Sequence, residues 1–193
     1  APLAYWPLDE TSGTTAADLS GNAFNGAIQN GPRLGAAPIR QGSARSIGFN
    51  LGGSGTQQVY VATATAGSTF ARLDQPGSSF TVCMWFKRTA SSNYNILIAS
   101  WGNYYSGPAN FRIQAGSAQA PDNVNNVPFT TPASDVMFLA WRKSAAAKYY
   151  DVTLNGQKIG QSGAFSDTNT KNGTQGLFFP AAYNISYYPA CGY

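Results

Sequence analysis

The chain has 193 residues, of which 43% are hydrophobic and only 10% are charged, and its net charge is +4. This length fits one domain over residues 1–193, and the apolar content suffices for a sizeable core and argues against disorder. The densest basic pairs, Lys87-Arg88 and Arg142-Lys143, are expected at solvated strand ends. The sequence shows no clustered basic face for nucleic acid and no apolar run near the roughly 18 residues that span a bilayer.

Strand signals recur along the chain at short spacing, separated by Gly, Pro, Asn and Ser, which indicates an all-β fold. Residues 5–13 predict an aromatic strand followed by a polar turn, and residues 18–26 predict a loop. Residues 46–50 and 58–61 then predict a pair of strands.

Residues 80–87 give the strongest strand signal. Their even-numbered positions hold Phe80, Val82, Met84 and Phe86, and their odd-numbered positions hold Thr81, Cys83, Trp85 and Lys87. Both sets include large apolar groups, so we expect a central strand that is covered on one face and partly covered on the other.

The second half of the chain continues the pattern. Strands are predicted at residues 95–101, 110–114, 136–140, 149–154, 157–160, 177–179 and 185–188. Asn155-Gly156 predicts a type I′ hairpin turn, because both positions must adopt positive φ angles. Residues 116–132 hold no clear element and are expected to form a long ordered surface loop or a binding loop.

Several of these segments resemble laminin-G-like, concanavalin A-like domains. The opening residues resemble the family's "W-x-L-D-E-x-S-G" strand and "D-x-S-G-N-x-x-x-G" loop, and residues 79–87 resemble its "SFT-x-x-x-W-x-K" strand. The hairpin at 149–159 resembles "V-x-L-x-V-N-G", and residues 80–83 also look distantly like a pentraxin strand. The resemblance implies a two-sheet antiparallel jelly-roll sandwich.

The chain departs from this pattern in two places. Pentraxins pair a cysteine with the neighbouring strand, whereas here Cys83 could pair only with Cys191, and two buried free thiols remain the alternative. The family's closing strand, which would lie beside residues 3–8, has no matching motif before Tyr193, so we expect that edge to be unpaired. An unpaired edge of that kind favours covering by a neighbouring subunit.

The residue types argue against catalysis. The sequence contains no histidine, which removes the commonest general base and metal ligand. Glycosidases need two carboxylates about 5–9 Å apart, but Asp9 and Glu10 are adjacent and would point to opposite faces of a strand. We therefore expect a protein that is not an enzyme.

The loop at 18–26 is the candidate metal site. Asp18, Asn22 and Asn25 offer carboxylate and amide oxygens of the kind that calcium prefers. Laminin-G-like relatives hold a structural calcium near such a loop, so the resemblance implies one here. The alternative is that Asp18 and Asn22 cap a tight turn through bonds to the backbone.

Aromatic residues supply the candidate ligand and partner sites. Tyr94, Trp101, Tyr104 and Tyr105 fall in or near the connection at 100–108 and could stack on sugar rings. The alternative places Trp101 in the core. Tyr187, Tyr188 and Tyr193 in the C-terminal segment are typical of interface residues.

Two function hypotheses follow. The first is a non-enzymatic glycan-binding or adhesive module on an extracellular, cell or virion surface. The second is a structural protein of a virus particle or another extracellular assembly, such as a decoration or fibre component. The partners are then carbohydrate or neighbouring subunits of an oligomer. The start at Ala1-Pro2 fits either a removed signal peptide or a trimmed initiator Met.

Overall fold

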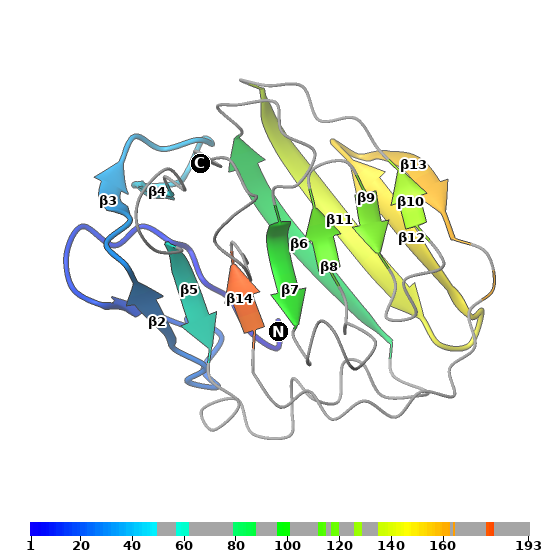
Figure 1. Cartoon of the computed structure of the whole chain (residues 1–193), viewed down its shortest axis with the longest axis horizontal. Helices are drawn as coiled ribbons and strands as arrows, with labels where there is room; N and C mark the ends of the chain where they lie inside the picture. The colour runs from blue at the N-terminus through cyan, green and yellow to red at the C-terminus, as the bar shows by residue number, and fades with distance from the viewer. Residues whose placement is uncertain are drawn as a thin grey trace.

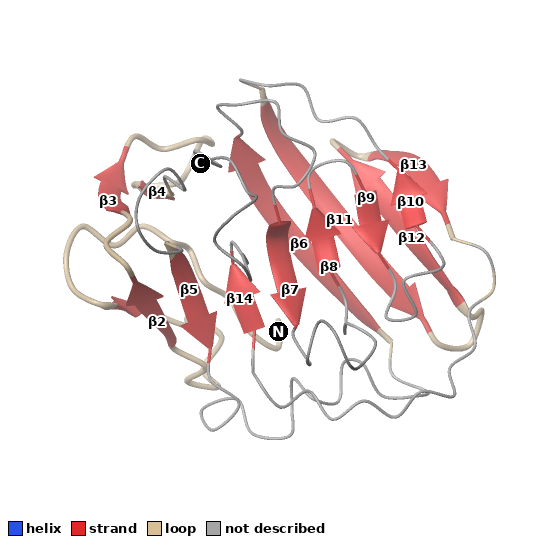
Figure 2. Ribbon diagram, viewed as in Figure 1, coloured by secondary structure: helices blue, strands red, loops and turns tan. Residues whose placement is uncertain are grey.

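The computed structural model describes residues 1–49, 57–61, 79–87, 96–100, 112–114, 117–119, 126–128, 135–162, 164 and 177–179; side chains are not described at 96–100, 112–114, 117–119, 126, 177 and 178. Every regular element in this part of the chain is a β-strand (Figure 2). The strands are β1 (Thr15–Ala16), β2 (Gly26–Gln29), β3 (Arg33–Ala36), β4 (Ser46–Gly48), β5 (Gln58–Val61), β6 (Phe80–Lys87), β7 (Ile96–Ser100), β8 (Arg112–Gln114), β9 (Ser117–Gln119), β10 (Asn126–Pro128), β11 (Val136–Ser144), β12 (Tyr149–Leu154), β13 (Gln157–Gln161) and β14 (Leu177–Phe179). A search of the described residues finds no helix suited to crossing a membrane.

The strands form two main antiparallel sheets and one small one. The larger sheet has the order β1-β2-β5-β14-β7-β8-β9-β10, the smaller has the order β13-β12-β11-β6, and β3 pairs with β4. In Figure 1, β7 to β10 of the larger sheet cross in front of β6, β11 and β12, so the two sheets form two layers. The predicted two-sheet antiparallel jelly-roll sandwich is confirmed.

The core lies between these layers and arises from alternation along the strands. In β11, Met137, Leu139 and Trp141 point inward and are at most 1% exposed, whereas the residues between them point outward. Trp141 stacks on Tyr150 of β12 with ring centroids 5.1 Å apart. The larger sheet contributes buried side chains that include Val59, Val61 and Phe179. Because every second residue of the smaller sheet is held in this core, its other side chains must form a common outer face.

The β12–β13 hairpin is fixed by its turn. Asn155 and Gly156 have φ angles of 50° and 83°, as the predicted type I′ turn requires. Asn155 also joins the turn to the middle of β11, since its N–H donates to the Phe138 carbonyl and its Oδ1 accepts from the Phe138 N–H, both at 2.8 Å. The turn therefore holds three strands in register.

The strands predicted near 46–50, 58–61, 80–87, 95–101, 110–114, 136–140, 149–154, 157–160 and 177–179 are confirmed, with bounds shifted by a few residues at some ends. The expected pairing of 46–50 with 58–61 is wrong, because β4 pairs with β3 while β5 pairs with β2 and β14 of the larger sheet. The prediction for 185–188 lies outside the described residues. The expected long loop at 116–132 is wrong, because β9 and β10 form there as short strands whose pairing along the sheet outweighs their weak local pattern.

Three other expectations need correction. Residues 5–8 form no strand, because the Tyr5 N–H donates to the side chain of Asp18 and Leu8 takes a positive φ of 56°. Strand β6 ends the order of the smaller sheet, so among the described strands it lies at an edge and is not central. Lys143 does not lie at a solvated end, because β11 continues to Ser144 and the alternation turns Lys143 inward, where it is 1% exposed.

Candidate functional site

The outer face of the four-stranded sheet, which points away from the core, carries aromatic and cationic side chains close together. The register across β6, β11, β12 and β13 arranges them in rows, because directly paired residues of antiparallel strands share a face. The rows along the sheet are Lys87 and Val136; Trp85 and Phe138; Cys83, Ala140, Thr153 and Lys158; Thr81, Arg142, Asp151 and Gln161; Ser144 and Tyr149. Successive rows are about 7 Å apart, which is twice the rise of a strand residue.

An aromatic pair lies at one end of this outer face. Trp85 and Phe138 are paired in register, and their ring centroids are 4.9 Å apart with planes inclined by 43°. Trp85 is 47% exposed, and the neighbouring Val136 is 37% exposed. Large apolar side chains held together on a surface mark a place for a ligand or partner more often than isolated ones do. The exposed face of Trp85, supported by Phe138, therefore offers an apolar surface to a ring.

The next row consists mainly of short side chains. Cys83, Ala140 and Thr153 lie side by side on three strands, between the aromatic row and the row of Arg142. Cys83 is a free thiol and is exposed. Partial desolvation nevertheless raises the pKa of the Cys83 thiol, so the group stays protonated and is a poor nucleophile at neutral pH. The short side chains of Cys83, Ala140 and Thr153 therefore separate the large side chains of the aromatic row from Arg142.

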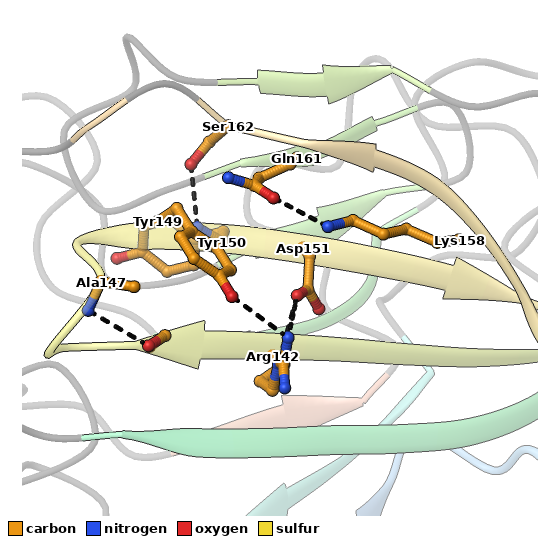
Figure 3. Close-up of polar contacts among 9 residues, drawn as sticks. Arg142, Ala147, Tyr149, Tyr150, Asp151, Lys158, Gln161 and Ser162 are labelled. Carbon is orange, nitrogen blue, oxygen red and sulfur yellow. Dashed lines mark hydrogen bonds and ion pairs between the residues drawn. The ribbon is translucent and has the colours of Figure 1, made fainter.

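Two cations meet at one tyrosine: Arg142 lies in the next row, and Lys158 lies at the β13 end of the Cys83 row. We call Arg142, Lys158 and Tyr149 between them the cationic cluster. Arg142 forms an ion pair with Asp151, whose side chain is 8% exposed, whereas that of Arg142 is 53% exposed. The Arg142 Nε donates to Asp151 Oδ2 at 3.2 Å, and its Nη2 donates to the same oxygen and to the Tyr149 hydroxyl at 3.3 Å (Figure 3). Hydrogen bonding and charge from Asp151 raise the pKa of Arg142 further, so its charge is permanent.

Lys158 completes the cluster from β13. Its Nζ lies 5.7 Å from the centroid of the Tyr149 ring, and the Arg142 Cζ lies 6.0 Å from the same centroid. Lys158 also donates to Gln161 Oε1 at 2.7 Å, as Figure 3 shows. One aromatic ring thus holds two cations within the range of cation–π attraction.

Hydrogen bonds to the Asp18 carboxylate hold the predicted metal loop in its conformation. Asp18 Oδ1 accepts from the N–H groups of Tyr5 and Ser20, and its Oδ2 accepts from the Ser20 hydroxyl and the Phe24 N–H, all at 2.8–2.9 Å. Burial alone would raise the pKa of Asp18, but these hydrogen bonds outweigh it and lower the pKa below its ordinary value. The carboxylate is thereby committed to protein donors.

The two asparagines of the loop also bond within it. Asn25 Oδ1 accepts from the Asp18 N–H at 2.9 Å, and Asn22 Nδ2 donates to the Leu3 carbonyl at 2.9 Å. No group of three or more acidic, Cys or His side chains suited to a metal occurs among the described residues. The bonds from Asp18 and Asn22 to the backbone are those that the alternative of a capped turn requires. Calcium binding there stays a prediction.

The two carboxylates considered for glycoside hydrolysis are not brought together as a pair. Glu10 Oε1 accepts from the Ala17 N–H at 2.9 Å, so this carboxylate fixes the backbone of the loop. Its Oε2 is buried without a hydrogen-bond partner.

The remaining predicted site residues lie outside the described part of the chain. They are Tyr94, Trp101, Tyr104, Tyr105, Tyr187, Tyr188, Cys191 and Tyr193. Cys83 shows no disulfide. Sequence reasoning missed the outer face, although two signals were present. Trp85 alternates with the core residues of β6, and the pair Arg142 and Asp151 lies at equal steps from the β11–β12 turn, which is how cross-strand partners are spaced.

Comparisons with known proteins reveal similar folds but do not assign the chain to a family. No family model matches the chain, and no curated protein matches it. A structure of botulinum neurotoxin type C, described as depending on two ganglioside molecules to enter cells, matches 91% of this chain with a TM-score of 0.59 and 15% identity. The binding domain of botulinum neurotoxin serotype D/C matches 88% with a TM-score of 0.54 and 15% identity. This chain spans only 42% and 41% of those chains. A Ruminococcus gnavus sialidase CBM40 bound to sialyllactose is more remote, with a TM-score of 0.43, 14% identity, and coverage of 75% of this chain and 80% of its own.

Proposed function

We propose that this chain is a non-catalytic carbohydrate-binding module that acts on an extracellular, cell or virion surface. The observation that carries the proposal is the exposed ring of Trp85, which is paired with the half-buried Phe138 and shares its face with the donors of Arg142 and Lys158. Aromatic rings stack on the apolar faces of sugars, and nearby donors orient the hydroxyl groups. The fold shared with a toxin binding domain supports the same class of function.

The test measures glycan binding by wild-type protein and by Trp85→Ala. Screening on a glycan array identifies a ligand, and titration calorimetry then gives its affinity. We expect Trp85→Ala to weaken binding by about tenfold or more, since a buried aromatic contact contributes on the order of 1.5 kcal/mol. Tyr5→Ala is the matched control, because Tyr5 is also an exposed aromatic residue, at 42%, but lies in the N-terminal segment.

A chemical footprint gives an independent readout. Cys83 lies in the row next to Trp85, so a bound saccharide should slow its alkylation by iodoacetamide, located by peptide mass spectrometry. Trp101→Ala tests the other aromatic set predicted from the sequence. If Trp101→Ala abolishes binding while Trp85→Ala and the Cys83 footprint show no effect, the sugar site lies at the connection 100–108.

A structural role in an assembly is the second candidate, and the edge position of β6 favours it. An edge strand with exposed Trp85 and a neighbouring exposed Val136 is suited to contact with another protein chain. Sedimentation of wild-type protein and Trp85→Ala separates the two functions. If Trp85→Ala dissociates an oligomer and no glycan binds wild-type protein, the assembly function replaces the carbohydrate one.

A further inference from the structure

The cationic cluster holds hydrogen-bond donors that the described protein leaves unused. Asp151 and the Tyr149 hydroxyl engage the Nε and Nη2 groups of Arg142, whereas its Nη1 donates to no group in the described part of the chain. Lys158 gives one of its three donors to Gln161. Two cations therefore present unused N–H groups beside the Tyr149 ring, on the face that carries Trp85.

The charges of the cluster do not cancel. Arg142 and Lys158 supply two positive charges and Asp151 one negative charge, and the Asp151 side chain is only 8% exposed and faces Arg142. The accessible charge is consequently positive. Arg142 is also held on one side by Asp151 and Tyr149, so less side-chain freedom is lost when its remaining N–H groups bind an anion.

We infer that the outer face selects an acidic saccharide, whose carboxylate or sulfate oxygens are bound by Arg142 and Lys158 while a second ring stacks on Trp85. This inference rests on the proposed carbohydrate function. Arg142 and Phe138 are four residues apart on β11, which places Arg142 about 14 Å from the aromatic pair along the strand. Lys158 lies in the row between them, on β13. The ligand is therefore longer than one sugar ring and spans the low row of Cys83, Ala140 and Thr153.

The experiment compares matched pairs of oligosaccharides that differ only in charge. Three pairs serve: sialyllactose and lactose, oligogalacturonate and its methyl ester, and a sulfated galactan oligosaccharide and its desulfated form. Calorimetry at low and high salt gives each affinity. For at least one pair, we expect the acidic member to bind tenfold or more tightly, with a preference that falls as salt rises. The carboxylate and sulfate arms identify which anion the cluster takes.

Substitutions test whether the cationic cluster causes the preference for acidic saccharides. Arg142→Gln alone would leave the buried Asp151 charge unpaired, so the double variant Arg142→Gln/Asp151→Asn removes both charges and preserves folding. This double variant should bind the acidic and neutral members of a pair equally, that is, lose the preference for the acidic saccharide. Arg142→Lys keeps the charge but not the planar fork and should keep only part of it. Arg45→Gln, an exposed arginine next to β4, is the control and should keep all of it.

The outcomes separate this inference from the proposed function. Equal affinity for acidic and neutral members, with Trp85→Ala still weakening both, overturns the acidic selection and leaves carbohydrate binding intact. Absence of binding to any saccharide overturns both. Equal binding to a single-stranded DNA oligonucleotide, used as a polyanion control, also overturns the inference, because the cluster would then attract any anion.

Discussion

The Asp18 carboxylate organises the N-terminal loop by joining three backbone segments. Its four hydrogen bonds reach Tyr5, Ser20 and Phe24, which are up to 19 residues apart in sequence. The path of the N-terminal backbone therefore depends on the side chain of Asp18. Charged acceptors make stronger hydrogen bonds than neutral ones, so this loop should respond to the charge of one residue.

Replacing Asp18 by Asn should lower the free energy of unfolding by about 3 kcal/mol at neutral pH, because buried N–H donors lose a charged acceptor. The pKa of Asp18 is lowered in the folded protein, so its contribution is complete above the unfolded pKa and is lost as the pH falls through the folded one. The difference between wild-type and Asp18→Asn protein should therefore shrink below about pH 4. Urea unfolding at several pH values measures it.

Asp9→Asn is the matched control and should change stability by less than about 0.5 kcal/mol. A chelator decides between the capped turn and a calcium site. With a capped turn, the melting temperature of wild-type protein does not change on chelation. A chelator-induced decrease that is absent in Asp18→Asn would instead establish calcium at this loop.

The Cys83 thiol should react slowly with iodoacetamide at neutral pH in spite of its exposure. Its raised pKa keeps the thiolate fraction small, and the alkylation rate should keep rising with pH beyond the ordinary thiol pKa of about 8.5. Rates relative to N-acetylcysteine measure this. Peptide mapping without reductant also tests pairing with Cys191, since a linked peptide containing both cysteines would contradict the free thiol.

At the scale of elements, the two sheets approach each other closely where β13 meets β10. A Cβ atom added to Gly160 would overlap Cγ1 of Val127, which is 2% exposed. Glycine is thus required here by the neighbouring strand rather than by its own φ angle, and the position sets how near the hairpin lies to the larger sheet.

Gly160→Ala should consequently destabilise the protein by about 1–3 kcal/mol through overpacking. Val127→Ala removes the colliding methyl groups, so the double variant should be less destabilised than the sum of the two single variants. Thermal and urea unfolding of wild-type protein, the two single variants and the double variant give the free energies for this double-mutant cycle. Strict additivity would show that the contact between β13 and β10 does not limit the packing.

At the scale of the whole molecule, the association predicted through the C-terminal segment is testable by truncation. Removing residues 187–193 deletes Tyr187, Tyr188 and Tyr193, which are expected to be buried against a partner. We expect the truncated chain to be monomeric by native mass spectrometry and to unfold at a similar urea concentration. A full-length protein that is monomeric at high concentration would contradict this prediction.

The fold class and most strand positions could be predicted from the sequence, because alternation and turn residues act over a few neighbours. Residues 80–87 and the Asn155-Gly156 hairpin are clear cases. The strands β9 and β10 could not be predicted, since their few residues depend on pairing along the sheet. The loop at 18–26 was located correctly, and whether its oxygens face a metal or the backbone depended on where Tyr5 lies.

The candidate site, in contrast, could be located only from the packing of strands that are distant in sequence. Trp85, Arg142 and Lys158 belong to three strands, and nothing local in the sequence shows that they share one face. The register between β6, β11, β12 and β13 brings them together, and the placement of β6 at an edge exposes Trp85. Strand order and register are set by burial of the opposite face in the core, which is a property of both sheets together and not of any one segment.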